Sequence, residues 1–193
     1  MPEDTDAEIS GSKGKKARAY GTAHGNVESL IRSIQSPALR AVARHWHEVR
    51  GARPMPSWAD ISEAVLSPYM NMLWGYKYDP KAKEFRAELA GNRLRKWIDK
   101  NFRGKRFQDL TSASNYEEAR GHLIRIVTTP LALRSSGRLF TVGDYDVTGE
   151  RIALPLAEDE KTCDGILGAS DYQPPPLLGP VQLLHENLEW YEI

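Results

Sequence analysis

Apolar residues along this chain change their spacing in a fixed order, and that order leaves few possible folds. Ser36 followed by Pro37 is typical of a helix N-terminus, because the serine side chain caps and proline needs no N–H at the first helical position. Behind them, apolar residues recur every three or four positions and predict a helix over 37–50. These residues are Leu39, Val42, Ala43, Trp46 and Val49.

From Met70 onward the hydrophobic period is two, which predicts a strand. Asp79 and Pro80 are turn residues, and a second alternating segment follows over 85–90. The sequence therefore predicts an antiparallel hairpin over residues 70–90 with one aromatic face.

A longer helical pattern runs from Tyr116 to a stop at Pro130, and three strand candidates follow it, around 131–142, 150–157 and 163–172. Two strands, a helical middle and three more strands predict an α+β fold. We expect a five-stranded antiparallel sheet with helices covering one face, preceded by an N-terminal helical extension.

The chain is expected to contain one domain, over 36–172. Residues 1–35 hold many charges and few large apolar groups, so they should remain disordered. Residues 173–193 begin with Gln173 and three prolines and form either a packed C-terminal arm or a free tail.

Composition excludes several classes of protein. The 193 residues carry 26 Lys and Arg against 26 Asp and Glu, so the chain is not a generally basic nucleic-acid binder. The single cysteine, Cys163, cannot form an internal disulfide and is expected to be a small buried strand residue. No run of about 18 apolar residues occurs, so we expect neither signal peptide nor membrane span, and a cytoplasmic protein.

Several short motifs follow one another in a fixed order along the chain. An Arg-Gly-x-x-Pro-x-Pro-Ser-x-x-Asp-Ile segment runs from Arg50 to Ile61, after the helix predicted over 37–50. Next come the Phe85 to Gly91 strand end, the strand from Arg151 to Leu156, and the Ile166-Leu167-Gly168 strand. This series resembles the small bacterial single-domain PAS family, whose members precede the fold with such a helix and segment, although Trp58 and Ala59 stand where the family usually carries arginine.

The resemblance implies a PAS-like sheet and a sensory or regulatory module in signal transduction without catalytic activity. It implies a pocket between sheet and helices that can bind a small molecule, but it names no cofactor. The chain carries no output domain, so an unknown protein partner would carry the signal onward. A homodimer is also expected, because the amphipathic helix over 37–50 lies outside the sheet-forming region.

The candidate pocket residues are the apolar side chains expected to surround any space between the sheet and the helices. A filled core is the alternative, and it is the usual role of an aromatic stripe. These residues are Trp74, Phe85, Leu89, Leu94, Trp97 and Ile126.

A nucleic-acid-contacting accessory protein is the second functional hypothesis. Residues 81–106 carry ten Lys and Arg against three Asp and Glu, interleaved with Trp97 and Phe102. The helical spacing of the apolar residues in this segment favours a helix face that covers the sheet instead.

Catalytic and metal sites have little support in the sequence. The Asp-x-Asp-x-Thr-Gly string from Asp144 resembles the first motif of haloacid-dehalogenase-type phosphatases, but too few residues follow it, so we expect a polar hairpin turn. It also fails as a calcium loop, because Pro155 occupies the twelfth position. His24, His122 and His185 are scattered and predict no haem or zinc site.

Overall fold

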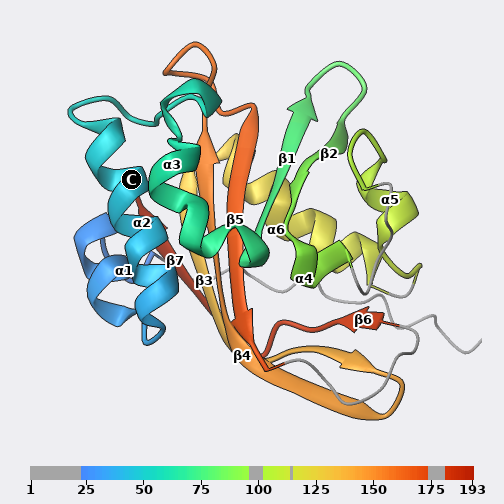
Figure 1. The fold of residues 1–193 in the computed structure, drawn as a ribbon. Coiled ribbons are helices and arrows are strands. Elements are labelled where there is room, and N and C mark those ends of the chain that lie inside the picture. The colour runs from blue at the N-terminus through green and yellow to red at the C-terminus, as the bar shows by residue number, and fades with distance from the viewer. Residues whose placement is uncertain (1–22, 96–101, 114, 174–180) are drawn as a thin grey trace, which may run out of the picture.

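A computed structural model of the chain describes residues 23–95, 102–113, 115–173 and 181–193. At its centre is a curled antiparallel sheet with the strand order β2-β1-β5-β4-β3-β6, and β7 also pairs with β3 (Figure 1). The strands are β1 (Leu73–Asp79), β2 (Glu84–Ala90), β3 (Leu131–Val142), β4 (Tyr145–Leu156), β5 (Gly165–Tyr172), β6 (Val181–Leu183) and β7 (Asn187–Glu192).

The helices divide into an N-terminal group and a middle group. The first comprises α1 (Val27–Ser33), α2 (Pro37–Arg50), η1 (Trp58–Asp60), α3 (Glu63–Leu66) and η2 (Ser67–Met72). The second comprises α4 (Asn92–Arg95), α5 (Phe107–Leu110) and α6 (Tyr116–Thr128).

All five expected strands are present, and the mixed α+β architecture is confirmed. The first strand begins at Leu73 rather than Met70, because residues 67–72 form a 3-10 helix with Pro68 in its first turn. The described part of the C-terminal arm is packed: β6 and β7 extend the sheet by pairing with the two halves of β3.

Helix α2 forms where the sequence places it. The Ser36 side chain accepts a hydrogen bond from the Leu39 N–H at 3.2 Å, and Gly51 ends the helix with φ of 58°. Its apolar face is buried against the sheet of the same chain, where the Trp46 Nε1 donates to the Pro155 carbonyl at 2.9 Å. The amphipathic face that suggested a homodimer is therefore used within the chain.

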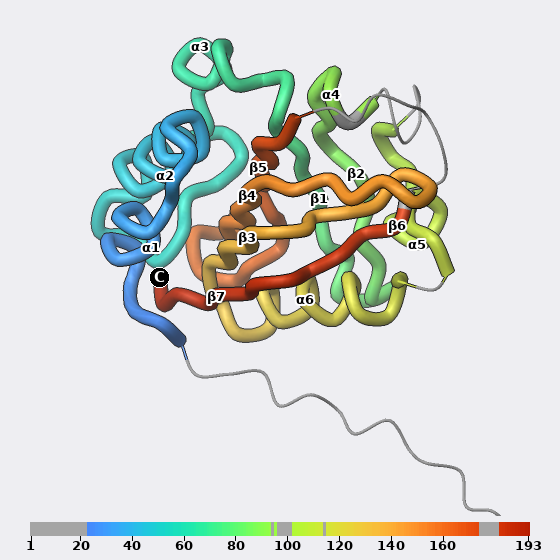
Figure 2. The backbone as a smooth tube through the Cα atoms, turned by 90° about the horizontal axis from the view of Figure 1, so that it is seen from below, coloured from blue at the N-terminus to red at the C-terminus, as the bar shows by residue number. Residues whose placement is uncertain are grey.

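The N-terminal helices and α6 cover opposite faces of the sheet (Figures 1 and 2). Consecutive residues of a strand point to opposite faces, so Arg151 and Ala153 of β4 face α6, whereas Ile152 faces the N-terminal segment. Trp58 lies on this second face, over Gly75 and Gly165, because a Cβ atom on either glycine would come within 2.7 Å of the indole.

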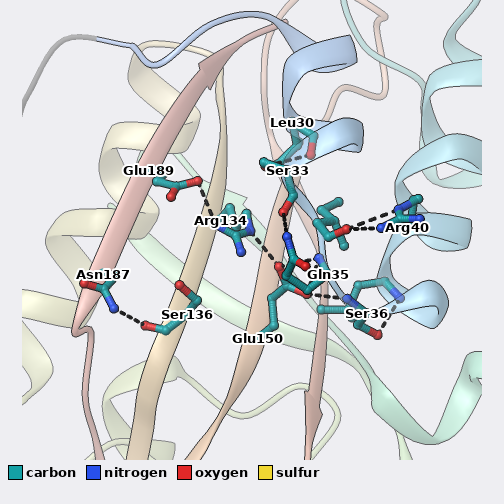
Figure 3. A network of polar contacts seen from close by, with 12 residues as sticks. Leu30, Ser33, Gln35, Ser36, Arg40, Arg134, Ser136, Glu150, Asn187 and Glu189 are labelled. Atoms are coloured by element: carbon teal, nitrogen blue, oxygen red, sulfur yellow. Dashed lines mark hydrogen bonds and ion pairs between the residues drawn. The ribbon is translucent and has the colours of Figure 1, made fainter.

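A polar network anchors α2 and β7 to the second face (Figure 3). The Glu150 carboxylate accepts hydrogen bonds from the Gln35 N–H at 3.0 Å and the Ser36 N–H at 2.7 Å, at the start of α2. The same carboxylate accepts from the Arg134 Nε at 2.6 Å, and a second nitrogen of Arg134 reaches the Glu189 carboxylate at 2.8 Å. Charged side chains on β3, β4 and β7 thus pair with one another.

Other chain segments bond to part of each edge of the sheet. One edge is formed by β6 and β7, and the last residues of β7 run beside the segment before α1, with the Glu192 N–H donating to the Gly25 carbonyl at 2.8 Å. Along β2, the Ala87 N–H donates to the Lys105 carbonyl at 2.9 Å, and the Gly104 N–H donates to the Ala87 carbonyl at 2.7 Å.

Candidate functional site

A cavity of about 90 Å³ lies between the sheet and the α5–α6 segment. Side chains from β1, β3, β4, β5 and β6 form one side of it. Its apolar walls are Trp74, Tyr76, Phe107, Leu110, Ala119, Leu123, Leu133, Ala153 and Leu183. Its polar lining is Thr111, Ser112, His122, Arg151, Ser170 and His185.

Trp74 is held flat against β5 at one wall of the cavity. Its Nε1 donates to the Ser170 Oγ at 3.0 Å. The indole occupies the space that a side chain at position 168 would fill, because a Cβ atom on Gly168 would lie 2.1 Å from the ring. Tyr76 continues this wall and packs edge-on against Phe107, with ring centroids 5.3 Å apart.

Arg151 brings a positive charge into this largely apolar space. Its Nε donates to the Ser170 Oγ at 3.1 Å, and no carboxylate in the described part of the chain forms an ion pair with it. Burial lowers the pKa of the guanidinium from 12.5 to about 10, with small opposing effects from Tyr172 and Tyr76. The group remains a cation at neutral pH.

Two histidines meet in the cavity. His122 on α6 and His185 beyond β6 lie with ring centroids 4.4 Å apart in an edge-on arrangement. Burial lowers the pKa of His122 to about 4 and that of His185 to about 2, and the charge of Arg151 contributes to both. Both rings are therefore neutral at pH 7 and can donate and accept hydrogen bonds.

Some polar atoms of the lining are buried without a hydrogen-bond partner among the described residues. They are both ring nitrogens of His185 and the Oγ1 of Thr111. Such atoms usually bind water or a ligand, because leaving them unpaired costs free energy. The cavity therefore offers hydrogen-bonding groups that the described protein segments do not use.

The sequence-predicted pocket residues lie in several places. Trp74 lines the cavity, while Phe85 and Ile126 are buried in the core and are absent from its lining. The side chain of Leu94 and all of Trp97 lie outside the described residues.

Leu89 faces a different hollow, on the opposite side of the sheet. A bulge is the reason: Gly75 pairs with Leu89 and Tyr76 pairs with Ala87, so β2 contains one extra residue. The regular alternation from Phe85 would place Leu89 beside Ala87 on the cavity face. The extra residue instead places it on the other face, near Trp58 and Met70.

The other residues and segments that the sequence analysis considered lie at structural positions outside the cavity. Asp144 lies in the turn between β3 and β4, which confirms the expected polar hairpin. Cys163 is buried just before β5, and burial raises the pKa of its thiol to about 12. In the basic segment, Arg86 forms an ion pair with Glu84 at 2.8 Å, and Arg106 forms one with Asp109 at 3.0 Å.

Neither a metal centre nor a membrane span is found within the described ranges. No group of three or more His, Cys, Asp or Glu side chains there is arranged to hold a metal ion. No helix there is long and apolar enough to cross a membrane.

Most of the polar residues that line the cavity were not predicted from the sequence. His122 and His185 are far apart in sequence, and only the return of the chain through β6 brings them together. Arg151 carried one available signal, since it is a charge that opens a strand whose alternate residues are otherwise apolar.

The comparisons with known proteins agree with the fold. A family model described as a PAS domain matches residues 34–170, which is more than half of the chain. No curated protein is similar enough to the chain to count as a match.

Proposed function

The chain belongs to the PAS domain family, and from this we propose that it is a sensory module that binds a small molecule in the cavity between the sheet and α6. The observation that carries the proposal is that both ring nitrogens of His185, beside the Arg151 cation, have no hydrogen-bond partner among the described residues. A fully packed core would leave no such unpaired nitrogens.

The size of the cavity supports a small ligand. Pockets for drug-sized ligands and large cofactors have volumes of roughly 300–1,000 Å³. A space of about 90 Å³ accommodates a compact molecule of roughly ten non-hydrogen atoms or fewer, and a flavin or a haem would require the surrounding elements to move.

Adjacent residue pairs on β4 and β5 connect the cavity to the opposite face of the sheet. On β4 and β5, Arg151 pairs with Ser170 on the cavity side, and the adjacent pair is Glu150 with Asp171. The Ser36 Oγ donates to the Asp171 carboxylate at 2.6 Å, so this second pair holds the start of α2. A ligand that shifts Arg151 would also act on α2, which we propose as the element that a protein partner reads.

Two further parts of the proposal concern partners. A homodimer stays a prediction, which light scattering at high protein concentration tests. Nucleic-acid binding by residues 81–106 is the alternative function, and it has less support because Arg103 pairs with Glu88, just as Arg86 and Arg106 pair with acids. Salt-dependent retention on nucleic acid would favour that alternative.

The module is proposed to be non-catalytic. A phosphatase would require Asp144 to act as a nucleophile, and this residue lies at an exposed hairpin turn outside the cavity. Metal-dependent phosphoester hydrolysis that is lost in Asp144→Asn would contradict the proposal.

Native and denaturing mass spectrometry of the purified chain test ligand binding directly. We expect a surplus mass in the native spectrum that disappears on denaturation. Ala119→Leu adds side-chain volume inside the cavity and should abolish the surplus, whereas Ala82→Leu, in the exposed turn after β1, should retain it. An unchanged surplus in Ala119→Leu would place the ligand elsewhere.

A further inference from the structure

Two of the arginines within the sheet, Arg134 and Arg151, have opposite electrostatic environments. Arg134, on the α2 face, contacts the carboxylates of Glu150 and Glu189. Arg151, on the cavity face, has only the Ser170 hydroxyl as a hydrogen-bond partner in the described chain. A half-buried cation without a counter-charge is costly, so an anion at this position would relieve the cost.

Ser170 adds a directed donor beside the guanidinium. Its Oγ accepts hydrogen bonds from both the Trp74 Nε1 and the Arg151 Nε. A serine hydroxyl has two lone pairs and one proton, so both acceptor positions are occupied and the O–H remains available to donate. The remaining N–H groups of Arg151 and the O–H of Ser170 therefore form a cluster of donors that requires an acceptor.

We propose that the ligand of this cavity is a small organic monocarboxylate, whose carboxylate binds Arg151 and Ser170 and whose apolar body packs against Trp74 and Leu123. This inference rests on the proposed function, since it names the ligand class of the same cavity. A planar carboxylate matches the geometry of a guanidinium and accepts two parallel hydrogen bonds from it.

The charge of the lining sets the charge of the ligand. Among the described residues that line the cavity, Arg151 is the one cation, because burial keeps His122 and His185 neutral. A single carboxylate balances that charge, whereas a dicarboxylate or a phosphate dianion would introduce a second, unpaired negative charge. The Oγ1 of Thr111 and the nitrogens of His185 can bind one further polar substituent.

Paired ligands of equal shape test the inference. Benzoate and benzamide differ in charge but little in size, and calorimetric titration of the full-length chain, refolded to remove any co-purified ligand, measures both. We expect benzoate to bind at least about tenfold more tightly, which corresponds to a hydrogen bond to a charged group. Butanoate with butanamide extends the test to a smaller body, and benzyl phosphate tests the dianion.

Substitutions of Arg151 test whether this residue causes the preference for benzoate over benzamide. Arg151→Met should make benzoate and benzamide bind equally, and Arg151→Lys should retain a weakened preference for benzoate. Arg138→Gln, on the exposed β3–β4 hairpin, is the matched control and should leave the preference unchanged. The comparison of benzoate with benzamide in the wild-type chain remains decisive if a variant fails to fold.

The outcomes separate the ligand class from the proposed function. Two outcomes would overturn the assignment of a carboxylate ligand while the proposed sensory function stands. One is equal or tighter binding of benzamide, and the other is a neutral co-purified compound that Ala119→Leu displaces. An empty cavity in the purified protein, together with no saturable binding of either ligand pair, would overturn both.

Discussion

Glu150 and Arg151 are neighbours in β4, yet their side chains belong to different sites on opposite faces of the sheet. Glu150 accepts hydrogen bonds from the N–H groups of Gln35 and Ser36 at the start of α2, whereas Arg151 lines the cavity under α6. One peptide bond therefore separates the proposed ligand contact from the contact that fixes the N-terminal helices. A movement of β4 by a fraction of a hydrogen-bond length would act on both.

Replacing Glu150 with glutamine should destabilise the fold by about 3 kcal/mol. The change removes one of the two carboxylates that pair with Arg134. The new amide N–H₂ would also face N–H groups that the Glu150 carboxylate accepts, so a buried hydrogen bond to a charged group is lost. Urea unfolding followed by circular dichroism measures the effect. Glu158→Gln, at an exposed position, is the matched control and should change stability by less than about 0.5 kcal/mol. Equal stability of the two variants would show that the network in Figure 3 contributes little.

Stability should fall as the pH decreases from about 6.5 toward 5. The pKa of His122 in the folded chain is about 4, below its ordinary value of 6.5, so the unfolded chain binds more protons across this range. For His122 the loss is roughly 2 kcal/mol at pH 5. Unfolding measured from pH 7.5 to 5 tests this. His122→Gln should make the profile less steep, and the rest of the slope comes from His185, whose pKa is lowered to about 2. A flat wild-type profile would contradict the burial of neutral imidazoles.

Gly168→Ala should destabilise the chain by about 2 kcal/mol or displace the Trp74 indole into the cavity. The new methyl group would overlap the ring, and overpacking of this kind is costly. Thermal unfolding and tryptophan fluorescence report the two effects. In a Trp74→Leu background the same substitution should cost clearly less, because the overlapping ring is gone. An equal cost in both backgrounds would assign the requirement for glycine to the backbone.

Trp190→Ala should cost about 3–5 kcal/mol. Trp190 on β7 is only 2% exposed, and the Arg125 guanidinium lies 4.2 Å from its ring centroid. Tyr145→Ala is the matched control, since that ring is 45% exposed, and it should change stability little. A small effect of Trp190→Ala in chemical denaturation would indicate that β7 is a dispensable tail.

The sequence predicted those elements whose local signals agree with their tertiary environment. The period of the 37–50 segment matches α2, and the apolar run after Pro130 matches β3 from its first residue to its last. The β2 bulge has no such signal, because Phe85, Ala87 and Leu89 alternate regularly in sequence while the register skips a residue. The start of β1 was misplaced for a related reason, since Met70 and Met72 alternate like strand residues inside a 3-10 helix.

The polar half of the candidate site depends on long-range packing and is invisible to local patterns. His185 reaches His122 only because β6 pairs with β3, and three consecutive prolines suggested an arm or a tail rather than a strand. Arg151 and Arg134 look alike in sequence, as basic residues next to apolar strand residues, and only the two faces of the sheet distinguish their partners.

The segments that lie along the two outer strands also limit how this protein can meet others. Many modules recruit peptides by strand addition, in which an extended ligand pairs with the open edge of a sheet. Here β6 and β7 form one edge of the sheet, and residues 24 and 25 bond to the outer side of β7 at Trp190 and Glu192. At the other edge, the Gly104–Lys105 segment bonds to Ala87 in the middle of β2. A partner that docks edge-on at these places would have to displace part of the chain itself. The same contacts protect these parts of the sheet against edge-to-edge aggregation.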